Sequence, residues 1–476
     1  FKNIIYIGAL SILLEIDPSA IERLFGEQFK GKEALVDANK QALTLGRDWA
    51  RENLDPTICK LKVKPVDRVG DRIFMEGNAA AALGCVYGGA TVCAWYPITP
   101  SSSVAEAYQA YCQRYRQDSE TGEAKYAIVQ AEDELASIGM VIGAGWNGAR
   151  AFTSTSGPGI SLMTEFIGLA YFAEIPAVII NVQRGGPSTG MPTRTQQADL
   201  IACAYASNGD TKHVMLFPED PKECFDFAAD ALDLADRLQT PIFVMSDLDI
   251  GMNTRVCNPL EWDDSRKFDR GKVMTAQELE AGDDFARYLD ADGDGIPYRT
   301  YPGSHETRGS YLTRGTTKDR HARYSEDGDV YVDNMERLLR KFEMARDIVP
   351  KPIRRNSIQD AHYGVLYFGS TSPAMDEALD LLEEQQNHMN AMRLRSFPFA
   401  ESVRNFILEH QAIFIVEQNR DAQMRQILIN ELGIDQSRVI AVCHYDGTPI
   451  TGRFIADVIG RHLEEFKLVS LKKAIS

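Results

Sequence analysis

The sequence predicts an α/β protein, with one doubly wound, mainly parallel sheet followed by a second, smaller α/β domain. Between residues 73 and 252 short apolar runs alternate with segments of helical periodicity, a pattern typical of βαβ units. The same alternation resumes after residue 352. A chain of 476 residues is also too long for one core, which favours two to four domains.

The residue pattern of the first 54 positions predicts helices. Asp17 and Pro18 form a helix start, because aspartate is a favoured N-cap and proline suits the first helical position. The charged stretch 60–72 has the composition of a linker. We therefore expect residues 1–70 to be the end of a truncated further domain followed by a linker.

The first sheet domain is expected over residues 71–252. We expect its strands at residues 93–96, 127–130, 150–155, 176–184, 213–217 and 241–247. Helical patterns lie between these runs, with apolar residues three to four positions apart.

Residues 253–352 are polar and poor in periodicity, which predicts an inserted arm or crossover that ends in a helix over 333–348. Within the arm, DADGDG (290–295) has aspartates at calcium-loop spacing, but Tyr301 stands where such a loop needs glutamate. A solvated turn is favoured over a metal ion. The second α/β domain is expected over 353–476, and its strands include MRLRSFPF (392–399).

Composition excludes several classes of function. The formal charge of −17, from 68 acidic and 51 basic side chains, argues against a nucleic-acid partner. The apolar stretch at 4–16 is short of the ~20 residues that cross a bilayer, so no membrane partner is expected. Eight scattered cysteines without a C-x-x-C motif argue against a local zinc or iron–sulfur site and favour reduced thiols in a cytoplasm.

The first candidate site is YPITPSSS (96–103), where a short strand leads into a helical pattern. We expect Thr99 at the N-cap and Pro100 at the first helical position. A helix start at the carboxyl end of a parallel strand favours a carboxylate or a phosphate. A plain N-cap without a ligand fits the local chemistry equally well.

Two further turns combine glycine with polar groups. In TSTSGPGISLM (153–163), Gly157 and Gly159 allow close backbone approach and Ser156 is a candidate cap. In NVQRGGPSTGMPTRTQQ (181–197), Arg184 ends a long apolar strand and precedes a glycine-rich loop. Loops of ~15 residues without secondary structure are usually functional or disordered, and function is favoured after a buried strand.

The fourth turn is QAEDELAS (130–137), which places Glu132 at the end of a strand. A carboxylate there would face the crevice in which open sheets bind ligands. Asp133 and Glu134 fall in the first helical turn, where acids usually serve the helix dipole.

The motifs YPITPSS, QAEDELASIG, TSTSGPGISLM and QRGGPSTGMPT follow one another between residues 96 and 193. This set resembles the α subunit of 2-oxoacid:ferredoxin oxidoreductases, most closely the 2-oxoglutarate type. Residues 1–54 resemble the end of the γ domain fused ahead of α in that branch. The resemblance implies a thiamine-diphosphate-binding domain of the pyrimidine type at 71–252 and a transketolase-C-terminal-like domain at 353–476.

The resemblance also assigns residue roles. Tyr96, Pro97, Ile98 and Gly157 would bind thiamine diphosphate, and Thr99 would lie near the thiamine ring and the carboxylate of the 2-oxoacid. Glu132 matches the glutamate that contacts N1′ of the aminopyrimidine and acts in acid–base catalysis.

Three further residues would form the substrate pocket. Arg184 matches the arginine that pairs with the substrate carboxylate, and Thr193 matches a pocket position. Arg194 is our own addition as a partner for a distal carboxylate.

The implied reaction is the coenzyme A-dependent oxidative decarboxylation of 2-oxoglutarate to succinyl-CoA, with electrons passing to ferredoxin, or its carbon-fixing reverse. The chain has no intact magnesium motif and no cluster cysteines. The resemblance therefore implies a β subunit that carries Mg²⁺ and a [4Fe-4S] cluster and shares the thiamine diphosphate in an (αβ)₂ assembly. The alternatives are the same reaction on pyruvate or branched-chain 2-oxoacids, another thiamine enzyme such as a transketolase, and a non-catalytic structural subunit.

Overall fold

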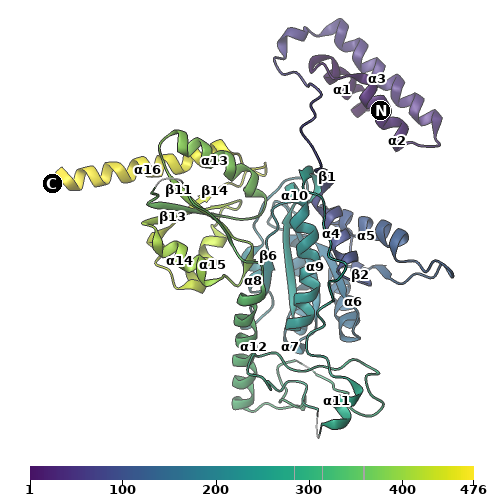
Figure 1. Cartoon of the computed structure of the whole chain (residues 1–476), viewed down its shortest axis with the longest axis vertical. Helices are drawn as coiled ribbons and strands as arrows, with labels where there is room; N and C mark the ends of the chain where they lie inside the picture. Colours follow the sequence, from purple (N-terminus) through teal and green to yellow (C-terminus); the bar gives the residue numbers. More distant parts are fainter. Residues whose placement is uncertain (283–284, 314, 358–359, 476) are drawn as a thin grey trace. The chain divides into compact units, whose positions relative to one another are not determined.

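The computed structural model describes residues 1–476 except 283–284, 314, 358–359 and 476 (Figure 1). The chain forms two compact units, Phe1–Asp71 and Arg72–Ser476. The first unit is helical, as the sequence predicted. It contains α1 (Lys2–Leu13), α2 (Pro18–Gln28), α3 (Glu33–Asn53) and the short 3₁₀ helix η1 (Pro56–Ile58).

Two features of the first unit follow directly from its sequence. Asp17 caps α2 by accepting from the amide of Ser19, with Pro18 at the helix start, so this prediction is confirmed. Glycines bring α1 and α3 together: a Cβ on Gly46 would lie 1.9 Å from the carbonyl oxygen of Ile5. The two helices therefore touch backbone to backbone, which no larger residue would allow at that position.

The second unit contains a seven-stranded sheet in the order β12-β6-β7-β5-β4-β2-β3. All neighbours pair in parallel except β12 and β6. The strands are β2 (Val92–Trp95), β3 (Ala127–Gln130), β4 (Ala151–Thr155), β5 (Ala177–Gln183), β6 (Val214–Leu216), β7 (Pro241–Asp247) and β12 (Ser396–Phe397). The predicted parallel sheet is confirmed, and β5 and β7 are buried along their whole length.

Helices pack on this sheet in two groups, in which α4 contacts α5 and α9, and α6 contacts α7. The helices of this part are α4 (Gly77–Tyr87), α5 (Ser102–Tyr115), α6 (Glu134–Trp146), α7 (Gly157–Ala173), α8 (Leu200–Ala204), α9 (Pro221–Leu238) and α10 (Leu248–Met252). A two-stranded antiparallel ladder joins β1 (Ile73–Glu76) to β8 (Thr254–Cys257).

The polar arm after β8 contains α11 (Ala276–Ala281) and ends in α12 (Gly328–Ile348), which includes the predicted helix at 333–348. The aspartates of DADGDG form ion pairs: Asp290 with Arg340 at 3.2 Å, and Asp292 and Asp294 with Lys272 at 2.8 Å each. Basic side chains of the arm therefore satisfy the charges of this acidic turn.

The arm is anchored on Glu174, the fully buried residue that ends α7 with a φ of 58°. Arg337 contacts both carboxylate oxygens of Glu174 at 2.6 and 3.0 Å, and Lys341 lies 2.8 Å from one of them. Lys341 also donates to the carbonyl of Gln239, which caps the end of α9. Burial alone would raise the pKa of Glu174, but Arg337 and Lys341 hold it well below its usual value. Cations at these helix ends also complement the negative ends of the helix dipoles.

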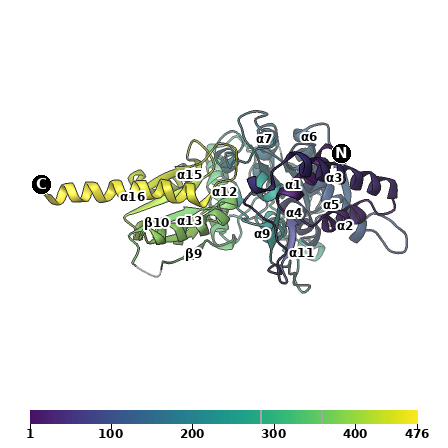
Figure 2. The ribbon, with the colours of Figure 1, turned by 90° about the horizontal axis from the view of Figure 1, so that it is seen from above.

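The C-terminal part of the second unit is a five-stranded sheet in the order β14-β13-β10-β11-β9, parallel except for β9. Its strands are β9 (Ile353–Arg355), β10 (Tyr363–Tyr367), β11 (Met389–Arg393), β13 (Ala412–Glu417) and β14 (Val439–Cys443). Its helices are η2 (Gly369–Thr371), α13 (Ser372–Glu384), α14 (Glu401–Glu409), α15 (Gln423–Leu432), η3 (Gln436–Arg438) and α16 (Gly452–Ile475). Figure 2 shows α16 running past this sheet to the C-terminus.

The prediction of one strand at MRLRSFPF is wrong. Met392 and Arg393 close β11 of the second sheet, whereas Ser396 and Phe397 form β12, which pairs with β6 of the first sheet. Strand β12 is only two residues long, and its apolar side chain is as buried as those of its neighbours. The sequence pattern alone does not reveal a change of sheet inside a continuous apolar run.

Among the described residues, no helix is both long and apolar enough to cross a bilayer. All eight cysteines are free thiols.

Replacing Glu174 with Gln should lower the free energy of unfolding by about 3–5 kcal/mol, because Arg337 and Lys341 would stay buried beside a neutral amide. Denaturant unfolding of both forms measures the difference. Asp376→Asn is the control, since Asp376 pairs with Arg355 at 2.9 Å but 73% of its side chain is exposed. That change should cost less than about 1 kcal/mol. Equal losses for the two variants would contradict the anchoring role of Glu174.

Candidate functional site

The four turns singled out from the sequence lie at one edge of the first sheet. They follow β2, β3, β4 and β5, which are neighbours in the order β5-β4-β2-β3 and run in parallel. The carboxyl ends of parallel neighbours meet at the same edge, and open α/β sheets bind ligands outside that edge.

The YPITP turn differs from its prediction. The amide of Ser101 donates to the carbonyl of Ile98 at 2.9 Å, so Thr99 and Pro100 form the centre of a four-residue turn, and the peptide bond between them is cis. Helix α5 begins only at Ser102, with Ser101 at the N-cap. The prediction that Thr99 caps this helix is therefore wrong, and its side chain is exposed.

Arg184 connects two of the turns. It follows β5, is only 6% exposed, and donates through Nη1 to the carbonyl of Thr99 and through Nη2 to the carbonyl of Thr189 at 2.7 Å. Its Nε is buried without a hydrogen-bond partner among the residues that the structure describes. Burial lowers the pKa of Arg184, and the charges of Asp199 and Glu134 oppose that shift. The predicted arginine is thus a buried, charged group at the centre of the edge.

The acidic turn places its glutamates differently from the prediction. Glu132 is exposed, whereas Glu134 is only 5% exposed. A Cβ added to Gly159 at the start of α7 would lie 3.1 Å from Oε1 of Glu134. Burial raises the pKa of Glu134, an effect to which Asp133 adds and which Arg184 opposes. Glu134 is therefore the acid of this turn that faces the interior.

The neighbouring Asp133 behaves as the sequence predicted for a helix start. It is the N-cap of α6, and its carboxylate accepts from the amide of Ala136 at 2.6 Å. Glu134 was also expected to interact only with the helix dipole, but it is buried. Local sequence does not tell which side of a first helical turn faces the interior.

A cavity of about 620 Å³ opens beside Arg184. Its walls come from α7, from the glycine-rich loop and from turns of the second sheet. The residues that line it are Gly157, Pro158, Ser161, Arg184, Gly185, Gly186, Pro187, Ser188, Met191, Gln196, Ala198, Asp199, Asn419, Arg420, Asp421, Gln423 and Tyr445.

Of the predicted site residues, only Gly157 and Arg184 line this cavity. The cavity is not lined by Glu132 or by residues 96–99 and 193–194. Thr193 and Arg194 are exposed, and Arg194 donates to the carbonyl of Thr193 at 3.1 Å. Among the YPITP residues, Pro97 and Thr99 are exposed and Tyr96 and Ile98 are half-buried.

Asp199, a second charged residue that lines the cavity, was not predicted from the sequence. Its Oδ2 accepts from Nδ2 of Asn181 at 3.1 Å, and a Cβ on Gly157 would lie 2.8 Å from its Oδ1. Burial raises the pKa of Asp199 to about 6, although Asn181 and Arg184 act in the opposite direction. An aspartate before a short helix resembles any N-cap, so only the fold identifies it.

The second sheet holds the glycine-rich loop in place. The amide of Thr195 donates to the carbonyl of Gly447 at 3.2 Å, and the amide of Gln197 donates to the carbonyl of Gln418 at 2.8 Å. The buried Asn419 donates from Nδ2 to the carbonyl of Gln197 at 3.1 Å. The loop that follows Arg184 is therefore clamped between the two sheets.

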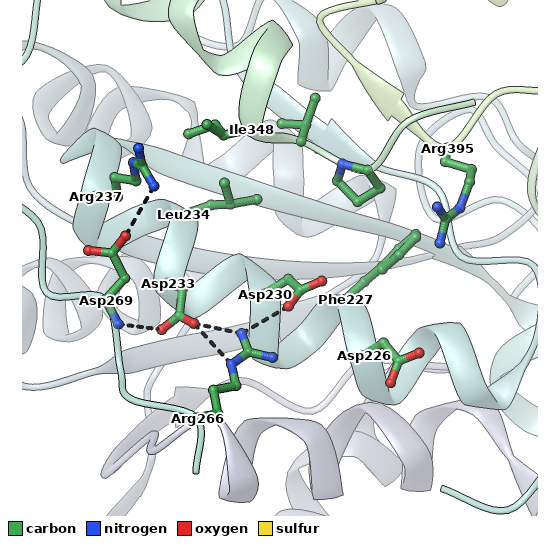
Figure 3. A pocket seen from close by; sticks show the side chains of 12 residues that line it. Asp226, Phe227, Asp230, Asp233, Leu234, Arg237, Arg266, Asp269, Ile348 and Arg395 are labelled. Atoms are coloured by element: carbon green, nitrogen blue, oxygen red, sulfur yellow. Dashed lines mark hydrogen bonds and ion pairs between the residues drawn. The ribbon is translucent and has the colours of Figure 1, made fainter. Parts of the chain in front are cut away.

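A second cavity, of about 520 Å³, lies along α9 (Figure 3). Its charges neutralise one another: Arg266 contacts Asp230 at 2.9 Å and Asp233 at 2.6 Å, and Arg237 contacts Asp269 at 3.4 Å. It lies away from the carboxyl edge of the sheet and contains none of the predicted site residues. We therefore place the candidate site at the cavity beside Arg184.

Comparison with known proteins shows the family to which the chain is similar. Residues 83–292 match the family model described as pyruvate flavodoxin/ferredoxin oxidoreductase, thiamine diphosphate-binding. The chain is 31% identical to 2-oxoacid:ferredoxin oxidoreductase 2, subunit alpha, of Aeropyrum pernix, over 97% of this chain and 72% of that protein. It is 32% identical to 2-oxoglutarate synthase subunit KorA of Methanothermobacter thermautotrophicus, over 73% of this chain and 88% of that protein.

A solved structure is similar over nearly the whole chain. It is the 2-oxoglutarate:ferredoxin oxidoreductase from Magnetococcus marinus with 2-oxoglutarate, coenzyme A and succinyl-CoA bound. The TM-score is 0.82 at 27% identity, covering 97% of this chain and 77% of that one.

Replacing Arg184 with Met should loosen the two segments that it joins, because both main-chain carbonyls lose their donor. We expect faster hydrogen–deuterium exchange in peptides covering 96–101 and 185–195, and unchanged exchange in β13. Arg194→Met is the matched control in the same loop, since the Arg194 side chain donates to the carbonyl of its neighbour Thr193. Identical exchange in wild type and Arg184→Met would show that Arg184 does not hold the turns together.

Proposed function

Because this chain belongs to the family of 2-oxoacid:ferredoxin oxidoreductase α subunits, we propose that it completes the thiamine site of an enzyme that oxidatively decarboxylates 2-oxoglutarate to succinyl-CoA. Coenzyme A accepts the acyl group and ferredoxin accepts the electrons, one at a time. The same site also serves the reverse, carbon-fixing direction.

The observation that carries this proposal is the presence of two buried charged groups, Arg184 and Glu134, at one sheet edge. Arg184 follows β5 and Glu134 begins α6, both at the carboxyl edge, and each influences the pKa of the other. A scaffold that only docked a partner would need neither group in a buried position, where an ionised side chain is costly. Perturbed, buried titratable groups beside a cavity are typical of catalytic sites.

The residues present fit thiamine diphosphate at this edge. Ser156 Oγ is buried there without a hydrogen-bond partner among the described residues, and the lack of a side chain at Gly157 and Gly159 lets Asp199 and Glu134 pack against the start of α7. With Tyr96, Pro97 and Ile98 these residues would hold the aminopyrimidine half of the cofactor. When bound, the cofactor supplies the nucleophilic carbon that makes loss of carbon dioxide from a 2-oxoacid feasible.

We assign the acid–base role to Glu134 in preference to Glu132. A carboxyl group that shares a proton with a pyrimidine nitrogen must be shielded from water, and its pKa must lie above its ordinary value. Glu134 meets both conditions, whereas Glu132 is exposed. Thr99 keeps a role near the substrate, since its carbonyl is fixed by Arg184.

Arg184 is the candidate partner for the substrate carboxylate. A guanidinium has five N–H donors in a planar fork. In Arg184 two of these donors bond main-chain carbonyls, which leaves three for a ligand. Thr193 and Arg194 follow in the same loop and are exposed. The choice of 2-oxoglutarate is supported by the relatives from Methanothermobacter and Magnetococcus, whose names specify it.

The proposed assembly is an (αβ)₂ complex in the cytoplasm. The β subunit would hold Mg²⁺, the diphosphate and a [4Fe-4S] cluster, and would face the carboxyl edge of the first sheet. In this chain, residues 1–70 form the γ-like helices and linker, 71–252 the pyrimidine-type domain, 253–352 the polar arm and 353–476 the transketolase-C-terminal-like domain. The α-subunit names of the relatives support a partner subunit of this kind.

Glu134→Gln, assembled with the β subunit, should reduce 2-oxoglutarate-dependent ferredoxin reduction by at least about a hundredfold, the contribution typical of an acid–base group. Glu132→Gln is the matched control two residues away and should retain turnover within a few-fold. Steady-state kcat at saturating 2-oxoglutarate measures both.

The result also separates the alternatives. The reverse pattern, with Glu132→Gln inactive and Glu134→Gln active, would return the role to Glu132. Full activity in both variants would favour the non-catalytic subunit. Turnover with pyruvate or a branched-chain 2-oxoacid but not 2-oxoglutarate would replace the substrate and keep the site.

A further inference from the structure

The cavity beside Arg184 contains a second ionisable group that the proposed reaction does not use. Asp199 lines the same cavity as Arg184, and its carboxylate lies over the first residue of α7. Helix α7 is 17 residues long, and its N-terminus carries the positive end of the helix dipole. The chain's own carboxylate therefore lies at the start of α7.

The surroundings of Asp199 fix its position. Asn181 on β5 donates to Oδ2 at 3.1 Å, and the amide of Asp199 itself donates to Oε1 of Gln183 at 3.1 Å. A side chain at Gly157 would collide with Oδ1 at 2.8 Å. These contacts hold the carboxylate on the cavity wall.

The charged and titratable groups around Asp199 are few. Arg184 after β5 lines the same cavity and lowers the pKa of Asp199, and Glu134 on α6 acts in turn on Arg184. Cys203 on α8 is adjacent, and burial together with Asp199 raises the pKa of its thiol well above the usual value, so it stays neutral. At the exposed rim, Arg420 and Asp421 pair with each other at 2.7 Å.

We propose that Asp199 is the counter-charge of Arg184 in the empty pocket, and that binding of a substrate carboxylate beside Arg184 is coupled to uptake of one proton by Asp199. Two carboxylates that share one site cannot both remain ionised without a large cost. The incoming carboxylate binds Arg184 directly, and Asp199, which lines the same cavity, takes up the proton and becomes the neutral acid. This inference rests on the proposed function only in taking Arg184 as the carboxylate partner.

The direction of the pH dependence follows from this exchange. Free Asp199 has a pKa of about 6, so it is ionised at neutral pH. A bound anion raises that pKa, and affinity therefore falls as the pH rises above 6, by up to about tenfold per pH unit. Below pH 6 the carboxyl group is already protonated, and affinity no longer changes through this residue.

Calorimetry on the assembled holoenzyme tests the coupling without turnover. Glutarate, a dicarboxylate without the keto group, is titrated at pH 7 in two buffers of different ionisation enthalpy, and the difference gives the protons taken up. We expect between about 0.5 and 1 proton per glutarate in wild type and none in Asp199→Asn. Binding without proton uptake in wild type would overturn the proposal even if the variant failed to fold.

The Michaelis constant for 2-oxoglutarate gives the second readout. In wild type KM should rise between pH 6.5 and 8, whereas in Asp199→Asn it should be flat and, at pH 8, lower than in wild type. A purely structural role for Asp199 would raise KM or lower kcat without removing the slope.

Asp421→Asn removes the same charge from the rim of the same cavity and should keep the wild-type slope. A slope that persists in Asp199→Asn would overturn the proposal. Absence of any 2-oxoacid turnover in wild type, with glutarate-linked proton uptake intact, would instead reject the proposed function and leave the role of Asp199 standing.

Discussion

The guanidinium of Arg184 is the contact on which the candidate site depends. It is buried at the end of β5 and bonds the main chain of the YPITP turn on one side and the glycine-rich loop on the other. Buried charges are stable only when they are hydrogen-bonded or paired, and here main-chain carbonyls and the nearby Asp199 and Glu134 supply that stabilisation. One side chain therefore arranges the backbone of the site and provides its positive charge.

The two ends of helix α7 have different roles in the domain. Its first residue, Gly157, lies in the cavity, whereas Glu174 at its other end anchors the polar arm through Arg337 and Lys341. The ion pairs that hold the arm are thus remote from the carboxyl edge of the sheet. The arm has a structural role in this account, and the loop between the sheets has the functional one.

The clamp on the glycine-rich loop explains why the second sheet is needed. Backbone bonds from Thr195 and Gln197 to the turns of that sheet leave the loop little freedom. A loop held in this way can place Arg184 with the accuracy that catalysis needs without regular secondary structure of its own. The cavity exists only because residues from both sheets form its walls.

Sequence reasoning predicted the parallel sheet, the four turns and Arg184, because strand ends and glycine-rich loops leave a clear local pattern. It misplaced the start of the helix at Thr99, since backbone bonds of a turn decide that boundary. It favoured Glu132 over Glu134. Glu134 is buried because it packs against the start of α7, and local sequence does not reveal that contact. It missed Asp199 and the two-sheet division of MRLRSFPF for the same reason: both depend on contacts between segments far apart in the sequence.

The Michaelis constant for 2-oxoglutarate in Arg184→Met, assembled with its β subunit, tests the central claim most directly. We expect a rise of at least about a hundredfold, the loss expected when a charge-assisted bidentate contact worth roughly 3 kcal/mol is removed. Arg194→Met, which removes a charge ten residues further along the same loop, should change KM by much less. Wild-type KM in Arg184→Met would contradict the account, because the carboxylate would then bind elsewhere.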